Sequence, residues 1–284
     1  REPDELPKLF VQATQEAGSS FSCADVYVEK FIERPRHIEF QVIADHHGDV
    51  EVLFERECSV QRRHQKLIEE APSPVLKPEV REATMMAIKS AFKAIGYTNA
   101  GTVEFLMDTD GSLYFIEVNA RIQVEHPVTE AITGVDLVKA QIRVAAGEKL
   151  GDILDRPIIM RGHAIECRIN AEHPESFTPS PGRIKAINVP GGIGIRVDTA
   201  AYADGVIPPY YDSLIAKLVA HGATRAEATS RMLRALELFI VEGIHTSIPL
   251  HQRILKDQAF IEAAIDTHYI QRFLERTKKA VFED

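Results

Sequence analysis

Cysteine is scarce in this sequence, and no two cysteines lie close together along the chain. The 284 residues include three of them, Cys23, Cys58 and Cys167, which lie far apart. No two have the CxxC spacing of zinc and redox sites, and an odd number of dispersed thiols does not suit a disulfide framework. The sequence therefore predicts neither kind of site, and it favours a reducing, cytoplasm-like compartment.

Sequence signatures of several common binding and catalytic folds are also missing. The chain has no GxxxxGK[ST] phosphate loop and no GxGxxG dinucleotide motif. The glycine-rich residues 191–194 are followed by a strand-like IRVD run instead of a helix, so they are predicted to form a turn. His163 lies in an apolar alternation and is predicted to be a core or supporting histidine, and the scattered residues give no Ser-His-Asp triad.

Long apolar runs and excess positive charge are absent too. No segment approaches the length needed to cross a membrane, and the first residues do not form a signal-peptide pattern. The formal net charge of −9 argues against a general partner among nucleic acids or anionic membranes, so neither is expected. With 45% hydrophobic and 26% charged residues, the composition is that of an ordinary globular protein. The length predicts about two domains.

The most informative stretch covers residues 101–130, GTVEFLMDTDGSLYFIEVNARIQVEHPVTE. Residues 102–107 and 113–118 are rich in aromatic and β-branched side chains, which favour strands. Between them lies Asp110-Gly111, a strong hairpin signal in such a context. The sequence therefore predicts two antiparallel strands joined by a two-residue turn.

That turn fixes which residues face each other. It would pair Leu106 with Phe115 and Glu104 with Glu117, and Asn119 would share the face of the two glutamates because alternate strand residues point to the same side. Carboxylates directly opposite repel each other, and a divalent cation such as Mg²⁺ would relieve that repulsion. The alternative is that both glutamates are solvated on an open sheet face.

The polar side continues past the second strand. Arg121, Gln123 and Glu125 alternate there with Ile122 and Val124. The planar guanidinium of Arg121 suits a small oxyanion, and Glu125 beside a cation site can act as a general base. A surface salt bridge between the two is the alternative.

Other elements of the first half follow from periodicity and turn residues. Residues 1–20 predict one helix, which would expose an apolar edge, so we expect a fragment or a processed chain. Residues 26–32 predict a strand. Residues 38–42 alternate as a half-buried strand and turn at 46–49 into a second strand at 50–55.

Charge and helical signals come next along the chain. The cationic run QRRHQK at 61–66 precedes Glu69 and Glu70; it is predicted either as a solvated charged segment or as an electrostatic clamp for phosphate or bicarbonate oxygens. Residues 78–95 predict a helix whose apolar face belongs to the core, and residues 135–146 predict a shorter helix.

The stretch 150–157 is the candidate boundary between two domains, because prolines interrupt it and strand-rich texture follows. Residues 163–170 predict a strand on which Glu166 and Arg168 share a face, with a weak ion pair as the plainest interpretation. Residues 212–219 predict another strand. Thr224 and Glu227 form a capping-box pattern for a helix to about Phe239, and two further amphipathic helices finish the chain.

Five motifs stand out between about Val26 and about Ile248, namely VYVEKFIERPRHIEFQV, ECSVQRRHQKLIEEAPSP, IEVNARIQVEHPVTE, CRINAE and PPYYDSLIAKL. Together they resemble the biotin carboxylases, the ATP-grasp component of acetyl-CoA carboxylase and related biotin-dependent carboxylases. It implies an α+β fold, in which an ATP-grasp C-terminal lobe with an antiparallel sheet is followed by a mixed α/β biotin carboxylase C-terminal domain. The implied ranges are 1–31 for a remnant of the lid subdomain, 32–155 for the lobe and 156–284 for the last domain.

The resemblance also implies a reaction. ATP would activate bicarbonate to carboxyphosphate with Mg²⁺ or Mn²⁺, and the carboxyl group would pass to biotin on a separate carrier protein. A carboxyltransferase and a second copy of the chain, in a homodimer, are the further implied partners. Biotin is not expected on this chain, because residues 85–89 do not match the Ala-Met-Lys-Met attachment motif.

Residue roles follow from the same likeness. Glu104, Glu117 and Asn119 would hold the metal against the nucleotide phosphates. Chemical roles are implied for four residues: Glu125 as the base for bicarbonate, Arg121 as its anion partner, Arg168 as the partner of the biotin enolate, and Lys66 as a phosphate contact. Further implied binding residues are Gln123 and the Val124 backbone for bicarbonate, Glu29, Lys30, Ile32 and Leu106 for adenine, and His37, Gln61 and His64 for ribose and phosphates.

One departure from the family pattern matters. In the family, an amino-terminal domain and a glycine-rich lid precede the position of Arg1, so we expect a carboxyl-terminal fragment with weak or no activity of its own. Two alternatives stay open. The chain could act only as a folded assembly module, or it could be a ligase of the carbamoyl-phosphate synthetase type, although CRINAE and PPYYDS speak against the latter.

Overall fold

The computed structural model describes residues 2–282 and divides the chain into two units, residues 1–33 and 34–284. The first unit contains a short 3-10 helix, Pro3–Glu5, and α1 (Leu6–Phe21), none of whose residues is buried. The helix predicted over the first twenty residues is confirmed. The strand predicted at 26–32 is wrong, because this unit has no other described strand with which the segment could exchange hydrogen bonds.

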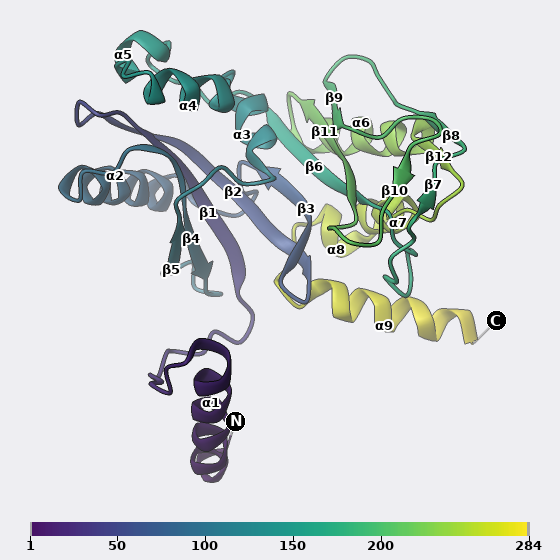
Figure 1. Ribbon diagram of the computed structural model, residues 1–284, viewed down its shortest axis with the longest axis horizontal. Helices are drawn as coiled ribbons and strands as arrows, with labels where there is room; N and C mark the ends of the chain where they lie inside the picture. Colours follow the sequence, from purple (N-terminus) through teal and green to yellow (C-terminus); the bar gives the residue numbers. More distant parts are fainter. Residues whose placement is uncertain (1, 283–284) are drawn as a thin grey trace. The chain divides into compact units, whose positions relative to one another are not determined.

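The second unit is built on an eight-stranded sheet whose neighbouring strands all run antiparallel (Figure 1). Two short ribbons accompany it, β7 (Gly182–Arg183) with β10 (Val206–Ile207) and β8 (Ala186–Asn188) with β12 (Ile240–Glu242). The eight strands, in their order across the sheet, are β5 (Leu113–Asn119), β4 (Asn99–Met107), β1 (Arg36–Ala44), β2 (Val50–Arg62), β3 (Gln65–Ala71), β6 (His163–Asn170), β11 (Leu214–Gly222) and β9 (Ile195–Thr199).

Helices pack against this sheet near both of its ends and over its central strands (Figure 1). None of the described helices is long and apolar enough to span a lipid bilayer. The helices of the second unit are α2 (Pro78–Ala94), α3 (His126–Thr133), α4 (Leu137–Ala145), α5 (Leu150–Ile153), α6 (Arg225–Leu238), α7 (Ile248–Lys256), α8 (Gln258–Ile261) and α9 (Tyr269–Phe282).

The hairpin of β1 and β2 forms where the alternation predicted it. Ile38, Phe40 and Val42 pack in one hydrophobic cluster with residues of α2. The expectation of a half-buried strand is wrong, however, since Glu39 and Gln41 on the opposite face are fully buried as well. Their burial is possible because a buried arginine on β2 provides hydrogen bonds to both.

The hairpin of β4 and β5 is also confirmed, and its turn differs from the prediction. Met107 pairs with Leu113, so residues 108–112 form a five-residue loop, and Leu106 faces Tyr114 instead of Phe115. An irregularity between Glu104 and Phe105 in the pairing then restores the expected register. The predicted pairing of Glu104 with Glu117 is confirmed for this reason.

The acidic residues that follow the QRRHQK run lie inside the molecule. Arg63 and His64 are exposed at the β2–β3 turn, but Glu69 and Glu70 are buried within β3. Within the QRRHQK run itself, residues 63–65 are exposed, whereas Gln61 is buried and Lys66 is half-buried. The interpretation as a solvated segment is therefore confirmed only for the middle of the run. His163 is buried and its Nε2 lies 2.7 Å from Oε2 of Glu70, so it is a buried histidine with a carboxylate partner.

The sheet continues across the candidate boundary at 150–157, because β3 pairs with β6. The domain ranges stay predictions. Beyond that stretch, β6, β11 and α6 share one hydrophobic cluster, and the Thr224 side chain caps α6 by accepting from the Glu227 amide. The helix predicted at 135–146 is confirmed as α4. The helix that precedes it, α3, was not predicted from the sequence.

Candidate active site

Glu125 lies at the centre of the charged side chains that the fold brings together. It is the N-cap residue of α3 and is 2% exposed. Its Oε1 lies 2.5 Å from Nζ of Lys66, and its Oε2 accepts from Nη2 of Arg168 at 3.0 Å. Three predicted catalytic residues from separate parts of the chain therefore meet directly.

Lys66 connects Glu125 to two further carboxylates. Its Nζ lies 2.5 Å from Oε2 of Glu39 and 3.2 Å from Oε1 of Glu104. Burial lowers the pKa of this ammonium, but the surrounding carboxylates outweigh burial and raise it above its usual range. Lys66 is consequently a fixed positive charge in this site.

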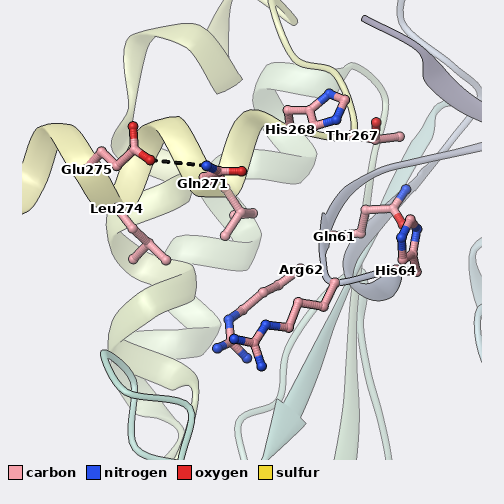
Figure 2. Close-up of a pocket in the computed structure, with 10 residues that line it drawn as sticks. Gln61, Arg62, His64, Thr267, His268, Gln271, Leu274 and Glu275 are labelled. Carbon is pink, nitrogen blue, oxygen red and sulfur yellow. Dashed lines mark hydrogen bonds between the residues drawn. The ribbon is translucent and has the colours of Figure 1, made fainter. Parts of the chain in front are cut away.

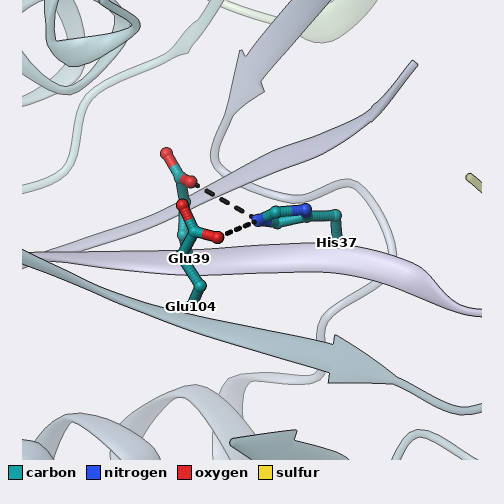
Figure 3. Close-up of side chains that lie close together, drawn as sticks. All are labelled: His37, Glu39 and Glu104. Atoms are coloured by element: carbon teal, nitrogen blue, oxygen red, sulfur yellow. Dashed lines mark ion pairs between the residues drawn. The ribbon is translucent and has the colours of Figure 1, made fainter. Parts of the chain in front are cut away.

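His37, Glu39 and Glu104 form a tight group on β1 and β4 (Figure 3). Nε2 of His37 lies 3.2 Å from a Glu104 oxygen and 3.7 Å from a Glu39 oxygen. Burial raises the pKa of both carboxyl groups, but their partners lower it by more. Arg56 and Lys66 bring the pKa of Glu39 to about 2, and His37 with Lys66 brings that of Glu104 to about 2. Both groups are ionised at neutral pH.

Arg56 on β2 supports this group from beneath and was not found from the sequence. It is fully buried, and its Nε donates to Glu39 at 2.6 Å. Its other nitrogens donate to four neutral oxygens, those of Gln41, Thr102, Gln123 and Thr129. Glu39 was missed as well, although its place between His37 and Gln41 in an alternating strand put it on the same face as His37.

The other two predicted metal residues lie further out. Glu117 is exposed on the edge strand β5 and accepts from Nδ2 of Asn119 at 3.1 Å. Arg121 is exposed and donates to Oδ1 of Asn119 at 3.3 Å. Glu104 and Glu117 face each other in register, so two carboxylates and an amide oxygen share one sheet face. Hard oxygen donors of this kind fit Mg²⁺ or Mn²⁺.

Gln123 and Val124 are held in place by hydrogen bonds to charged side chains. Oε1 of Gln123 accepts from Arg56 at 2.9 Å, and its Nε2 donates to Glu104 at 2.7 Å. The Val124 carbonyl accepts from Nζ of Lys217 on β11 at 3.1 Å. Lys217 was not found from the sequence, because the strand that carries it comes almost a hundred residues later.

Gln61 and His64 line an open hollow of about 500 Å³ between the β2–β3 turn and α9 (Figure 2). Thr267 and His268 form its opposite side, and no signal in the sequence pointed to them. Leu106 is half-buried on β4 and pairs with His37 across to β1. Glu29, Lys30 and Ile32 lie in the first unit, whereas the other site residues lie in the second.

One thiol adjoins the carboxylates. Cys58 has its sulfur within 4.8 Å of oxygens of Glu39 and Glu125. Burial raises the pKa of this thiol well above its ordinary value, so it stays protonated and suits a hard cation poorly.

Two family models match the chain one after the other. Residues 1–153 match the carbamoyl-phosphate synthase L chain, ATP binding domain, and residues 166–272 match the biotin carboxylase C-terminal domain. The two matches together distinguish the family from other ligases that share only the first. The chain belongs to the biotin carboxylase family.

Relatives from a Nostoc species and from Methanothermobacter thermautotrophicus align over nearly the whole chain. The biotin carboxylase of Nostoc sp. is 55% identical over 95% of this chain and 61% of its own length. A pyruvate carboxylase subunit of Methanothermobacter thermautotrophicus is 54% identical over 96% of this chain and 55% of its own length. The chain thus spans little more than half the length of these relatives.

Solved biotin carboxylase structures share the fold. The biotin carboxylase domain dimer of the Hydrogenobacter thermophilus 2-oxoglutarate carboxylase, in complex with MgADP, ADP and bicarbonate, superposes with a TM-score of 0.89 at 50% identity. The match covers 96% of this chain and 60% of that one. The Campylobacter jejuni biotin carboxylase gives a TM-score of 0.91 at 42% identity, over 96% of this chain and 60% of that one. The expected ATP-grasp fold with an antiparallel sheet is confirmed.

Proposed function

We propose that this chain takes part in the ATP- and bicarbonate-dependent carboxylation of biotin on a carrier protein, through carboxyphosphate. The observation that supports this most is the Glu125 carboxylate, buried between Lys66 and Arg168 and next to Gln123. A buried carboxylate held between two cations, at the edge of a hard-oxygen cluster, is suited to move a proton beside a phosphorylated substrate. Family membership supports the same reaction.

Glu104, Glu117 and Asn119 are the residues that would hold Mg²⁺ or Mn²⁺. The bound metal neutralises charge on the nucleotide phosphates and so makes the terminal phosphorus open to attack. Glu104 contributes because it is already ionised, and its neighbours His37 and Lys66 prevent it from taking up a proton near neutral pH. Arg121 donates to Asn119, which supports a role for it beside the proposed metal and anion positions.

Glu125 is the proposed base for bicarbonate. It would accept the bicarbonate proton on one carboxylate oxygen, and a bicarbonate oxygen would attack the terminal phosphorus of ATP with ADP as the leaving group. Arg121, Gln123 and the Val124 backbone would hold the anion. Both Glu125 oxygens accept from cations in this structure, and each keeps a second lone pair that could take the proton.

Arg168 is the proposed partner of biotin. Burial lowers the pKa of its guanidinium, but the charges of Glu69 and Glu125 raise that pKa by more than burial lowers it. The group therefore remains a cation. A fixed cation stabilises the oxyanion that forms on biotin when its ureido nitrogen loses a proton. Interactions of this kind contribute about 3 kcal/mol to the transition state.

ATP would lie along the face that carries the metal residues. His37, Gln61, His64 and Lys66 would contact ribose and phosphates, and Leu106 would contact adenine. The adenine roles of Glu29, Lys30 and Ile32 stay predictions. The hollow lined by Gln61 and His64 supports a ribose position near Thr267 and His268, which we add to the nucleotide-binding residues. In the Hydrogenobacter thermophilus relative, the same domain binds MgADP and bicarbonate.

The proposed partners are a biotinyl carrier protein, a carboxyltransferase and a second copy of this chain. The dimer of the Hydrogenobacter thermophilus domain supports the homodimer. Relatives with a pyruvate carboxylase name support a link to a carboxyltransferase. The cytoplasmic location and the silent assembly module stay predictions.

A chimera tests the function in a full-length setting. This chain replaces the matching part of the Nostoc sp. biotin carboxylase, and bicarbonate-dependent ATP cleavage is measured with free biotin or ammonia as the acceptor. We expect biotin to stimulate cleavage and ammonia to have no effect. Stimulation by ammonia, or no bicarbonate-dependent cleavage, contradicts the proposal.

The matched variants are Glu125→Gln in the site and Glu82→Gln on the exposed face of α2. Loss of a general base typically lowers the rate about 10²- to 10⁴-fold. We expect that loss for Glu125→Gln, with MgADP binding retained, and an unchanged rate for Glu82→Gln. Full turnover by Glu125→Gln would contradict the assignment of Glu125 as the general base.

A further inference from the structure

Two glutamates face each other behind Arg168, on the sheet face that α3 covers. Glu69 of β3 pairs directly with Glu166 of β6, and both side chains are fully buried. Residues in such cross-strand positions have Cβ atoms about 5 Å apart. Two buried carboxyl groups are therefore held at close range by the backbone itself.

These two groups have few hydrogen-bond partners. Oε1 of Glu69 accepts from Nε of Arg168 at 2.6 Å, but Oε2 of Glu69 and both oxygens of Glu166 have no donor among the described residues. Glu70, the next residue on β3, differs, because it accepts from Arg225 and lies 2.7 Å from His163. A buried carboxylate without donors is costly, and a proton is the simplest partner that removes the cost.

The charged groups around the pair cannot neutralise both glutamates. Arg168 is divided between Glu69 and Glu125, and Lys66 serves Glu39, Glu104 and Glu125. Lys217 of β11 donates to the Val124 carbonyl and lies 3.7 Å from Asp198. His126 of α3 faces the Gln123 carbonyl and Glu130. No described cation lies within 4 Å of Glu166.

Proton affinities agree with this geometry. Burial, together with the Glu69 charge, raises the pKa of Glu166 well above its ordinary value. Burial also raises the pKa of Glu69 to about 7, although Arg168 opposes it. The pair therefore retains at least one proton at neutral pH.

We propose that Glu69 and Glu166 share one proton, that the carboxylic acid of Glu166 donates to Oε2 of Glu69, and that the pair positions Arg168 for its substrate. One proton leaves the pair with a single negative charge, which matches the single charge of Arg168. Arg168 is then anchored at Nε by Glu69 while its Nη2 is free to leave Glu125 and turn to a substrate. The positioning role rests on the proposed function, whereas the shared proton does not.

Infrared spectroscopy of the 284-residue chain tests the shared proton. At pH 7 we expect a protonated-carboxyl band that is sensitive to D₂O and lost in Glu166→Gln. Glu70→Gln, which alters an equally buried but ion-paired neighbour, should retain it. Glu57 also has a raised pKa, so the band is assigned from the difference between wild type and variant. Loss of only an ionised carboxylate band in Glu166→Gln overturns the proposal.

If Glu166→Gln does not fold, Glu69→Gln provides a second infrared test of the shared proton. In Glu69→Gln the acceptor of the Glu166 proton changes from a carboxylate to an amide, so the protonated band should shift in frequency. An unshifted band contradicts the pairing.

The positioning role is tested in the chimera with the Nostoc sp. enzyme. Glu69→Gln should lower kcat/KM for biotin about tenfold or more. Glu166→Gln, whose amide can still donate to Glu69, should stay within about threefold of wild type, whereas Glu166→Leu should behave like Glu69→Gln. Equal losses in Glu166→Gln and Glu166→Leu contradict the role. An inactive wild-type chimera would count against the proposed function and leave the infrared result standing.

Discussion

Two pairs of glutamates occupy equivalent positions in the same sheet and differ in proton affinity. Glu39 faces Glu104 across β1 and β4, and Glu69 faces Glu166 across β3 and β6. All four are buried. The pKa values of the first two lie near 2, whereas those of the second two are raised.

The number of cations accounts for the difference. Glu39 pairs with Arg56 and Lys66, Glu104 pairs with Lys66, and both lie close to His37. Glu69 has part of Arg168, and Glu166 has no described cation within 4 Å. Register alone therefore does not decide the ionisation state of facing carboxylates. The first pair is poised for cations and phosphates, and the second pair retains a proton.

The largest expected effect comes from removing the cation that the first pair depends on. Arg56→Met leaves Glu39 buried without its guanidinium, and it also removes donors from Gln41 and Gln123. Breaking a buried ion pair on one side costs about 3–5 kcal/mol. Urea denaturation at pH 7 measures the loss. The double variant Arg56→Met with Glu39→Leu should recover part of it, and no recovery would argue against charge as the cause.

The next largest effect is that the contributions of Glu39 and Glu69 to the free energy of unfolding depend on pH in opposite directions. The folded-state pKa of Glu39 lies below its unfolded value of 4.5, so its contribution is complete above pH 4.5 and is lost as the pH falls to about 2. The contribution is on the order of 3 kcal/mol. For Glu69, whose folded pKa is about 7, the contribution is complete below pH 4.5 and is lost as the pH rises to about 7.

Thermal unfolding between pH 3 and 8 separates the two pairs. The advantage of wild type over Glu39→Gln should shrink towards acid pH. By contrast, the stability of Glu69→Gln relative to that of wild type should increase as the pH rises from 5 to 7. Parallel pH profiles for the two variants would contradict the comparison.

The smallest effect on stability is expected at Glu117, the exposed member of the proposed metal site. Glu117→Gln on the edge strand should change the free energy of unfolding by less than about 0.5 kcal/mol, because the side chain is exposed. The same change should weaken Mn²⁺ binding by the chimera with ADP present, since it removes a charged donor. Calorimetric titration measures the binding, and unchanged affinity would exclude Glu117 from the metal site.

The sequence predicted the residues whose partners lie nearby in the chain or whose motif is distinctive. The Asp110-Gly111 turn placed Glu104 opposite Glu117, and the family motifs pointed to Glu125, Arg168 and Lys66. The pairing of Leu106 was wrong because the loop has five residues and an irregularity in the hairpin corrects the register, which no local signal shows.

Residues held by long-range pairing were missed. Glu39 was expected on the exposed side of a half-buried strand, and Arg56 was not singled out. The burial of Arg56 depends on β4 and α3, which provide Thr102 and Thr129 as its acceptors. Glu69 and Glu166 are almost a hundred residues apart and meet only because β3 pairs with β6. Such pairs follow from the order of strands in the sheet, which periodicity does not supply.

A crystal structure of the chimera with MgADP and bicarbonate tests the central assignment most directly. We expect bicarbonate on Arg121 and Gln123, with one Glu125 oxygen at about 2.6–3.2 Å from a bicarbonate oxygen and Arg168 still anchored by Glu69. Bicarbonate bound elsewhere, with both Glu125 oxygens still held by Lys66 and Arg168, would contradict the account.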